Sequence, residues 1–153
     1  MRKQSAGLMM FRRRGGEVEV LLAHPGGPFW QLRDAGAWTI PKGGIHAGEQ
    51  PLDSAIREFK EETGFDACPP FIPLGRIVQR SGKIVHAWAF EGDCDPAAIR
   101  SNTFTLEWPP RSGHHREFPE VDRAGWFDLE AAAEKILQGQ MPFLHRLAER
   151  LGE

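Results

Sequence analysis

The sequence predicts a single α/β domain in which a mixed β-sheet lies between helices. Strand-like and helix-like patterns are intermingled along the chain without the strict alternation of a parallel βαβ fold. The length of 153 residues and an apolar share of 41% suit one compact domain with one buried core. We therefore expect residues 1–153 to fold as one unit.

The first two strands are expected at residues 6–11 and 18–23, which are apolar runs of strand length. Arg12-Arg13-Arg14 and Gly15-Gly16 separate them, so this basic cluster is interpreted as a solvated hairpin end. Residues 24–36 contain several glycines and prolines and carry Phe29 and Trp30. This composition indicates an aromatic-bearing loop, a common place for ligand contacts.

A short strand over residues 37–40 is expected to end at Pro41, and residues 42–48 supply glycines for tight turns. The clearest helix follows, beginning at Pro51 and stopping at Gly64. Its apolar residues recur at the spacing of one helix face, at Leu52, Ala55, Ile56 and Phe59.

Residues 71–80 and 83–90 predict a second hairpin, and residues 103–108 and 124–127 predict further strands. Helices are expected at residues 129–138 and 142–151. The polar, proline-bearing stretch 108–116 is interpreted as a solvated surface loop, with a lid that contacts phosphates as the alternative.

Composition bounds the partners and the location. No run approaches the roughly 20 apolar residues of a membrane span, and the N-terminus lacks the apolar core of a signal peptide, so a cytoplasmic location is expected. A net charge of -2 makes bulk nucleic-acid binding unfavourable but permits a small anionic ligand. Cys68 and Cys94 are expected to be free thiols, and the oligomeric state is left open.

Three glutamates crowd one side of the expected helix at Pro51. At 100° per residue, Glu58, Glu61 and Glu62 fall within a sector of about 100° beside the apolar stripe. Like charges at these spacings repel, so stability alone would not select them, whereas a hard cation such as Mg²⁺ would remove the conflict. The alternative is a solvated acidic face that pairs with Arg57 and Lys60.

The frame around these glutamates resembles the Nudix box, G-x5-E-x7-R-E-U-x-E-E-x-G-U, where U is a bulky apolar residue. Gly43, Glu49 and the run Arg57 to Phe65 meet every specified position. The resemblance implies an α/β/α sandwich with a mixed sheet. It also implies a metal-dependent hydrolase, using Mg²⁺ with Mn²⁺ as a substitute, that cleaves a pyrophosphate linkage in a nucleoside diphosphate joined to another moiety.

By this resemblance, Glu58 and Glu62 are metal ligands, Glu61 is a further ligand or activates water, and Gly43 offers a backbone carbonyl. Arg57 would orient Glu61 by a charge-assisted hydrogen bond, with Glu49 supporting the cluster from the loop side. The family usually adds an acid before a Trp-containing strand. Glu120, six residues before Trp126, is the candidate general base or extra ligand, with Glu117 as competitor.

The substrate is expected to be a small nucleotide, either a dinucleoside polyphosphate or a nucleoside triphosphate. The run Trp38 to Gly43 looks like the entrance to the box in the dinucleoside-polyphosphate-hydrolysing branch, where Lys42 would contact a phosphate. Trp30 and Trp38 are the candidate substrate-binding aromatics, although the chain lacks the tyrosine common in that branch. An RNA 5′-end pyrophosphohydrolase, a sugar-nucleotide hydrolase and a non-hydrolysing nucleotide sensor remain alternatives.

Overall fold

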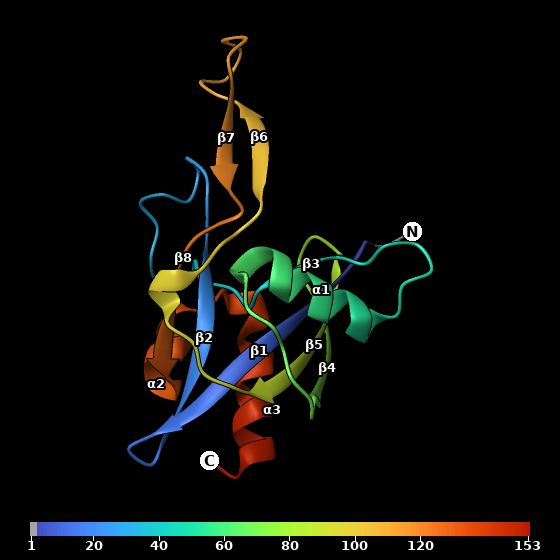
Figure 1. Ribbon diagram of the computed structural model, residues 1–153, viewed down its shortest axis with the longest axis vertical. Helices are drawn as coiled ribbons and strands as arrows, with labels where there is room; N and C mark the ends of the chain where they lie inside the picture. The colour runs from blue at the N-terminus through green and yellow to red at the C-terminus, as the bar shows by residue number, and fades with distance from the viewer. Residues whose placement is uncertain (1–2) are drawn as a thin grey trace.

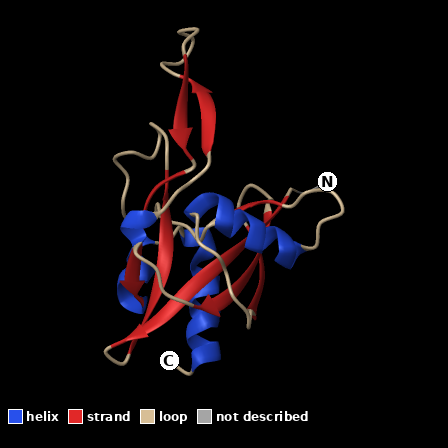
Figure 2. Ribbon diagram, in the orientation of Figure 1, coloured by secondary structure: helices blue, strands red, loops and turns tan. Residues whose placement is uncertain are grey.

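The computed structural model describes residues 3–153 and contains one large mixed sheet with helices on both faces (Figures 1 and 2). The strand order is β4-β5-β1-β2-β8, and β3 pairs with β1 off this path. The strands are β1 (Gln4–Arg14), β2 (Glu17–Pro25), β3 (Lys42–Gly44), β4 (Ile72–Val78), β5 (Ile84–Glu91), β6 (Thr103–Glu107), β7 (His115–Pro119) and β8 (Val121–Asp128). The helices are α1 (Pro51–Thr63), α2 (Leu129–Lys135) and α3 (Met141–Leu151), with short 3₁₀ turns at Pro96–Ala98 and Gln138–Gln140.

The central strand β1 makes the sheet mixed, because it runs antiparallel to β2 and parallel to β5. Its side chains alternate between two cores, as the period of two in a strand requires. Leu8 and Met10 pack with Phe59 on the side covered by α1. Met9 and Phe11 lie in the other core, with the residues of α2 and α3. The predicted α/β/α sandwich is therefore confirmed.

Helix α1 occupies the predicted range. Pro51 stands at its first turn, and Gly64 ends it in the left-handed conformation at φ 82°, where its N–H donates to the carbonyl of Lys60. Ala55 and Phe59 are buried beneath the helix against the sheet. This packing leaves the glutamate-bearing side free to face the loops above the sheet.

Residues 37–44 differ from the prediction. The expected strand at residues 37–40 forms only isolated bridges, Ala23 with Thr39 and Trp38 with Ile136, whereas the expected turn at Lys42–Gly44 is strand β3. It pairs with residues 5–7 of β1. The approach is so close that a Cβ on Gly7 would lie 2.5 Å from the carbonyl oxygen of Pro41. Glycine at position 7 thus permits a pairing that local propensity does not reveal.

The C-terminal half also departs in detail from the sequence-based expectations. The helix expected at residues 129–138 ends at Lys135, because the backbone of Ile136 is extended. The N–H of Ile136 still donates to the carbonyl of Ala132 as the last hydrogen bond of the helix. Residues 103–119, here called the arm, form a separate two-stranded ribbon that projects from the body of the molecule (Figure 1). The expected surface loop at 108–116 is partly strand, since β7 begins at His115. No helix in residues 3–153 is long and apolar enough to cross a membrane.

Candidate active site

Four glutamates from two distant parts of the chain line one cavity of about 270 Å³. Three of them, Glu58, Glu61 and Glu62, lie on α1, and Glu120 is the residue that directly precedes β8. We call this cavity the glutamate pocket, and its other lining residues are Lys42, Gly43, Gly44, Asn102 and Thr103. The structure therefore brings together the three predicted helix glutamates, the predicted backbone at Gly43 and the predicted outlying acid.

Strand β3 lies against the glutamate side of α1. A Cβ on Gly43 would lie 2.0 Å from Oε2 of Glu58, which no side chain can tolerate without displacing that carboxylate. A Cβ on Gly44, one residue further, would meet nothing within 4 Å. Glycine at position 43 therefore lets the Glu58 carboxylate lie directly against the backbone of β3.

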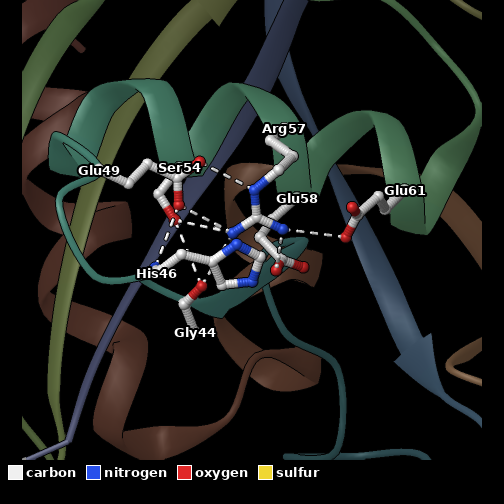
Figure 3. A network of polar contacts seen from close by, with 7 residues as sticks. All are labelled: Gly44, His46, Glu49, Ser54, Arg57, Glu58 and Glu61. Atoms are coloured by element: carbon white, nitrogen blue, oxygen red, sulfur yellow. Dashed lines mark hydrogen bonds and ion pairs between the residues drawn. The ribbon is translucent and has the colours of Figure 1, made fainter.

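Arg57 is the centre of a polar network, with its guanidinium between Glu49 and Glu61 (Figure 3). Its Nε and Nη2 donate to the two carboxylate oxygens of Glu49 at 2.9 and 3.0 Å. Its Nη1 donates to Glu58 at 2.8 Å and to Glu61 at 3.1 Å. The hydrogen bonds from Arg57 hold the pKa of Glu49 down to about 2. Arg57 thus holds three carboxylates in fixed directions.

The acidic-face alternative accounts for only part of this arrangement. Arg57 does pair with Glu58 and Glu61, but Lys60 pairs with Asp66 at 3.1 Å instead of with a helix glutamate. Burial, followed by the negative charges of Glu58 and Glu120, raises the pKa of Glu62 to about 8. A buried carboxyl with that shift marks a place where negative charge exceeds its compensation.

Glu120 shares this electrostatic environment. Partial burial and then the charge of Glu58 raise its pKa above the ordinary value. Its position is fixed through Asn102, whose N–H donates to the carbonyl of Glu61 at 2.9 Å and whose carbonyl accepts from the N–H of Glu120 at 2.8 Å. Glu117 lies on β7 and does not line the glutamate pocket. Its carboxylate accepts a hydrogen bond from the Thr103 hydroxyl at 3.4 Å.

The donor set of the glutamate pocket fits a hard divalent cation. Four carboxylates line the pocket, and carboxylate oxygens are the ligands that hard divalent cations prefer. Among residues 3–153, no group of three acidic, His or Cys side chains lies close enough together to hold a metal ion by side chains alone. A divalent cation held here would therefore need further oxygen ligands, such as water or phosphate.

A second cavity, of about 280 Å³, adjoins the glutamate pocket and shares Lys42, Glu62 and Glu120 with it. We call it the Trp30 pocket, and its remaining lining residues are Pro25, Trp30, Thr39, Gln79, Val121 and Leu137. Lys42 lines both cavities, and burial and the nearby Lys83 lower its pKa. Predicted substrate contacts Trp30 and Lys42 are thus beside the glutamates.

Trp38 does not reach either cavity, which corrects the expectation that it contacts substrate. Its side chain lies in the core at 6% exposure, with edge-to-face contacts to His24 and Phe127. Its Nε1 donates to Asp34 at 2.8 Å. The Trp38 ring thus packs against apolar neighbours while its single polar atom has a hydrogen-bond partner.

His24 joins the two walls of the Trp30 pocket and was not singled out from the sequence. Its ring is fully buried, and its Nδ1 lies 2.9 Å from Oδ1 of Asp122 on β8. Its Nε2 lies 2.6 Å from the carbonyl oxygen of Arg33 in the loop between β2 and β3, here called the aromatic loop. Gln79, Asn102 and Leu137 were missed as well. Each belongs to no motif and reaches the site only through the tertiary fold.

Comparisons with known proteins agree with this geometry. The NUDIX domain family model matches residues 1–147. An RNA pyrophosphohydrolase of Agrobacterium fabrum is 31% identical over 74% of this chain and 68% of its own length. An octanoyltransferase of Myxococcus xanthus is 29% identical over 87% of this chain, which spans only 33% of that protein.

Among solved structures, a C. elegans Ap4A hydrolase binary complex superposes with a TM-score of 0.68 at 23% identity, covering 98% of both chains. This similarity establishes the fold. The family model covers nearly the whole chain, and the box from Gly43 to Phe65 contains three of the four glutamates that line the glutamate pocket. The chain therefore belongs to the Nudix family.

Proposed function

We propose that the chain hydrolyses a pyrophosphate linkage in a nucleotide and that the glutamate pocket is where this reaction occurs. The observation that carries the proposal is the convergence of Glu58, Glu61, Glu62 and Glu120 around the backbone at Gly43. Membership of the Nudix family supports a pyrophosphohydrolase that depends on a divalent cation.

In this proposal, Glu58 and Glu62 hold Mg²⁺, or Mn²⁺ in its place, with the Gly43 carbonyl and Glu61 as further ligands. A bound cation would neutralise phosphate charge and lower the pKa of the attacking water. Arg57 fixes the directions of Glu58 and Glu61, so little reorganisation is needed when phosphate arrives. Each of these roles follows the Nudix box.

Glu120 is the proposed general base. Its carboxylate takes a proton from water as the water oxygen forms a bond to phosphorus and the bridging P–O bond breaks. Its raised pKa moves it toward the range in which a carboxylate accepts a proton effectively. Its backbone tie to α1 through Asn102 keeps it beside the helix glutamates.

The substrate's nucleoside is proposed to lie in the Trp30 pocket. Trp30 offers an aromatic face for a base, and Lys42 offers a cation between that base and the glutamates. Two substrate types fit such a site, a dinucleoside polyphosphate and the 5′ end of an RNA. The similarity to an RNA pyrophosphohydrolase favours the second, because it is a sequence relationship of 31% identity.

The test is product release from dinucleoside polyphosphates, nucleoside triphosphates, sugar nucleotides and 5′-triphosphate RNA, with Mg²⁺, with Mn²⁺ and with EDTA. Metal-dependent turnover that Glu61→Gln or Glu120→Gln reduces by at least about 100-fold would support the proposal. Tight nucleotide binding without turnover of any compound would instead favour a nucleotide sensor.

A further inference from the structure

The arm has no role in the chemistry proposed above, although it begins at the site. Within residues 3–153, β6 and β7 pair only with each other, and they extend away from the main sheet (Figures 1 and 2). A two-stranded ribbon is marginally stable in water unless one of its faces is covered. The composition of the two faces of the arm therefore indicates what could cover it.

The two faces of the arm differ in character. Cross-strand partners share a face, so Phe104 with Phe118 and Leu106 with Arg116 lie on one side. The alternate pairs, Thr105 with Glu117 and Glu107 with His115, lie on the other. We call the first side the aromatic face. Its apolar side chains are half-buried, and both carboxylates of the arm lie on the opposite side.

Two arginines of the arm have guanidinium groups that form no ion pair within residues 3–153. Arg111, at the tip, is the single non-glycine residue of the described chain with a positive φ, 61°. Its backbone N–H donates to Glu107, which holds the tip, while no ion pair engages its guanidinium among residues 3–153. Arg116 likewise lacks an ion pair there and lies 5.6 Å from the ring centre of Phe118. Strained backbone of this kind concentrates at functional sites.

The aromatic face continues from the proposed substrate site. Thr103, at the base of the arm, lines the glutamate pocket. Trp108, at the far end of β6, lies edge-on to Phe29 with ring centres 5.4 Å apart, and Phe29 is 62% exposed. Phe29 directly precedes Trp30, which lines the Trp30 pocket. Aromatic side chains thus extend from that pocket to the tip of the arm.

We propose that the aromatic face, with Arg111 and Arg116, binds the single-stranded RNA that follows a 5′-terminal nucleotide held in the Trp30 pocket. This inference rests on the proposed function and selects the RNA end as its substrate class. Unpaired bases stack on aromatic side chains, and guanidinium groups pair with phosphates. The five residues of β6 span roughly 15 Å, more than one nucleotide, so the tip would meet nucleotides downstream of the first.

The first experiment measures binding without catalysis. Fluorescence anisotropy is recorded with an eight-nucleotide 5′-hydroxyl RNA for wild type and for the double variant Arg111→Gln/Arg116→Gln. We expect binding to weaken about 10-fold, and the slope of log K against log salt to become shallower by about 1.4, the value for two lost phosphate contacts to a single strand. The variant sites are exposed and lie outside the core.

The matched control is Arg13→Gln/Arg150→Gln, which changes the net charge equally. Arg13 is near the end of β1 and Arg150 is in the last turn of α3, and both elements end on the side of the molecule opposite the arm (Figure 1). The control should bind this RNA as wild type does. Equal weakening in both double variants would overturn the proposal, because it would mean that the RNA responds only to overall charge.

The second experiment follows hydrolysis of 5′-triphosphate RNA of one, two, four and eight nucleotides. We expect kcat/KM to rise with length in wild type, and this rise to be lost in the arm variant without a change for the single nucleotide. Length-independent kcat/KM in wild type would overturn the arm proposal alone. Absence of turnover with every length, alongside arm-dependent RNA binding, would overturn the proposed function and leave the binding surface in place.

Light scattering after size exclusion separates RNA from a second copy of the chain as the occupant. We expect the same mass for wild type and the arm variant. A dimeric wild type that becomes monomeric in the variant, with unchanged RNA affinity, would assign the aromatic face to self-association and overturn the proposal.

Discussion

At the scale of single residues, the environment of Glu62 makes the stability of the protein depend on pH. Burial among other carboxylates raises its pKa from an ordinary 4.5 to about 8. Between these values the metal-free fold binds more protons than the unfolded chain. Stability from this group is therefore fully present below about pH 4.5 and is lost as pH rises through about 8.

Glu62→Gln should consequently stabilise the metal-free protein at pH 9, on the order of a few kcal/mol, because it removes a buried charge. The same variant should gain little at pH 4.5. Urea unfolding in EDTA at both pH values measures the difference. A variant no more stable than wild type at pH 9 would mean that the Glu62 carboxylate is well solvated.

His24 provides a second residue-scale prediction. His24→Leu keeps an apolar side chain in the core but leaves Asp122 and the Arg33 carbonyl without their shared partner. We expect a loss of about 2–4 kcal/mol in the free energy of unfolding. Because the aromatic loop carries Trp30, KM should rise several-fold while kcat changes little.

The control for His24→Leu is His145→Leu, at an exposed position of α3. It should unfold and turn over as wild type does. A KM unchanged in His24→Leu, despite reduced stability, would show that the aromatic loop keeps its position without this tie.

At the scale of elements, helix α1 could be predicted from the sequence and strand β3 could not. The helix is predicted by local signals, which are Pro51 at its start, the spacing of its apolar residues and Gly64 at its end. The strand depends on residues far away, because Lys42–Gly44 becomes extended by pairing with residues 5–7 of β1. The resemblance to the Nudix box nevertheless placed both elements at one site.

The contact of β3 with α1 yields an element-scale prediction. Gly43→Ala would place a methyl group 2.0 Å from the present position of Glu58 Oε2, so the carboxylate or the strand must move. Displacements of about 1 Å at a reacting centre can cost about 100-fold in rate, and we expect a loss of that order in kcat/KM. Gly44→Ala is the matched control and should retain activity, since its methyl group meets no atom within 4 Å.

The burial of Trp38 and the choice of Glu120 over Glu117 could not be predicted from the sequence, because both depend on how distant elements pack. The position of Trp38 in the chain places it at the entrance to the box, but its side chain packs in the core against His24 and Phe127. Glu120 and Glu117 are indistinguishable by sequence spacing alone. The ladder between β6 and β7 separates them, because it holds Glu117 on the arm and leaves Glu120 at its base.

At the scale of the whole molecule, the sheet and its helices bring together segments that are about sixty residues apart, so the site and the fold are thermodynamically linked. A cation that binds the assembled glutamate pocket, and not the unfolded chain, stabilises the fold by RT ln(1 + [L]/Kd), about 2.7 kcal/mol at 100 times Kd. The carboxylates of the pocket come from α1 and from the residue before β8. Cation binding should therefore raise the melting temperature of the entire domain in one transition.

The size of this stabilisation should depend on pH in the opposite sense to the stability of the metal-free protein. Glu62, with its pKa at about 8, must lose its proton before it can serve as a ligand, so Mg²⁺ competes with that proton. We expect 10 mM Mg²⁺ to raise Tm more at pH 9 than at pH 6, as measured by scanning calorimetry. In Glu62→Gln the increase should be small at both pH values, while Lys60→Gln, which removes a charge paired with Asp66 outside the pocket, should respond as wild type does. An equal Mg²⁺ effect at pH 6 and pH 9 in wild type would separate the ion from Glu62 and place it elsewhere on the molecule.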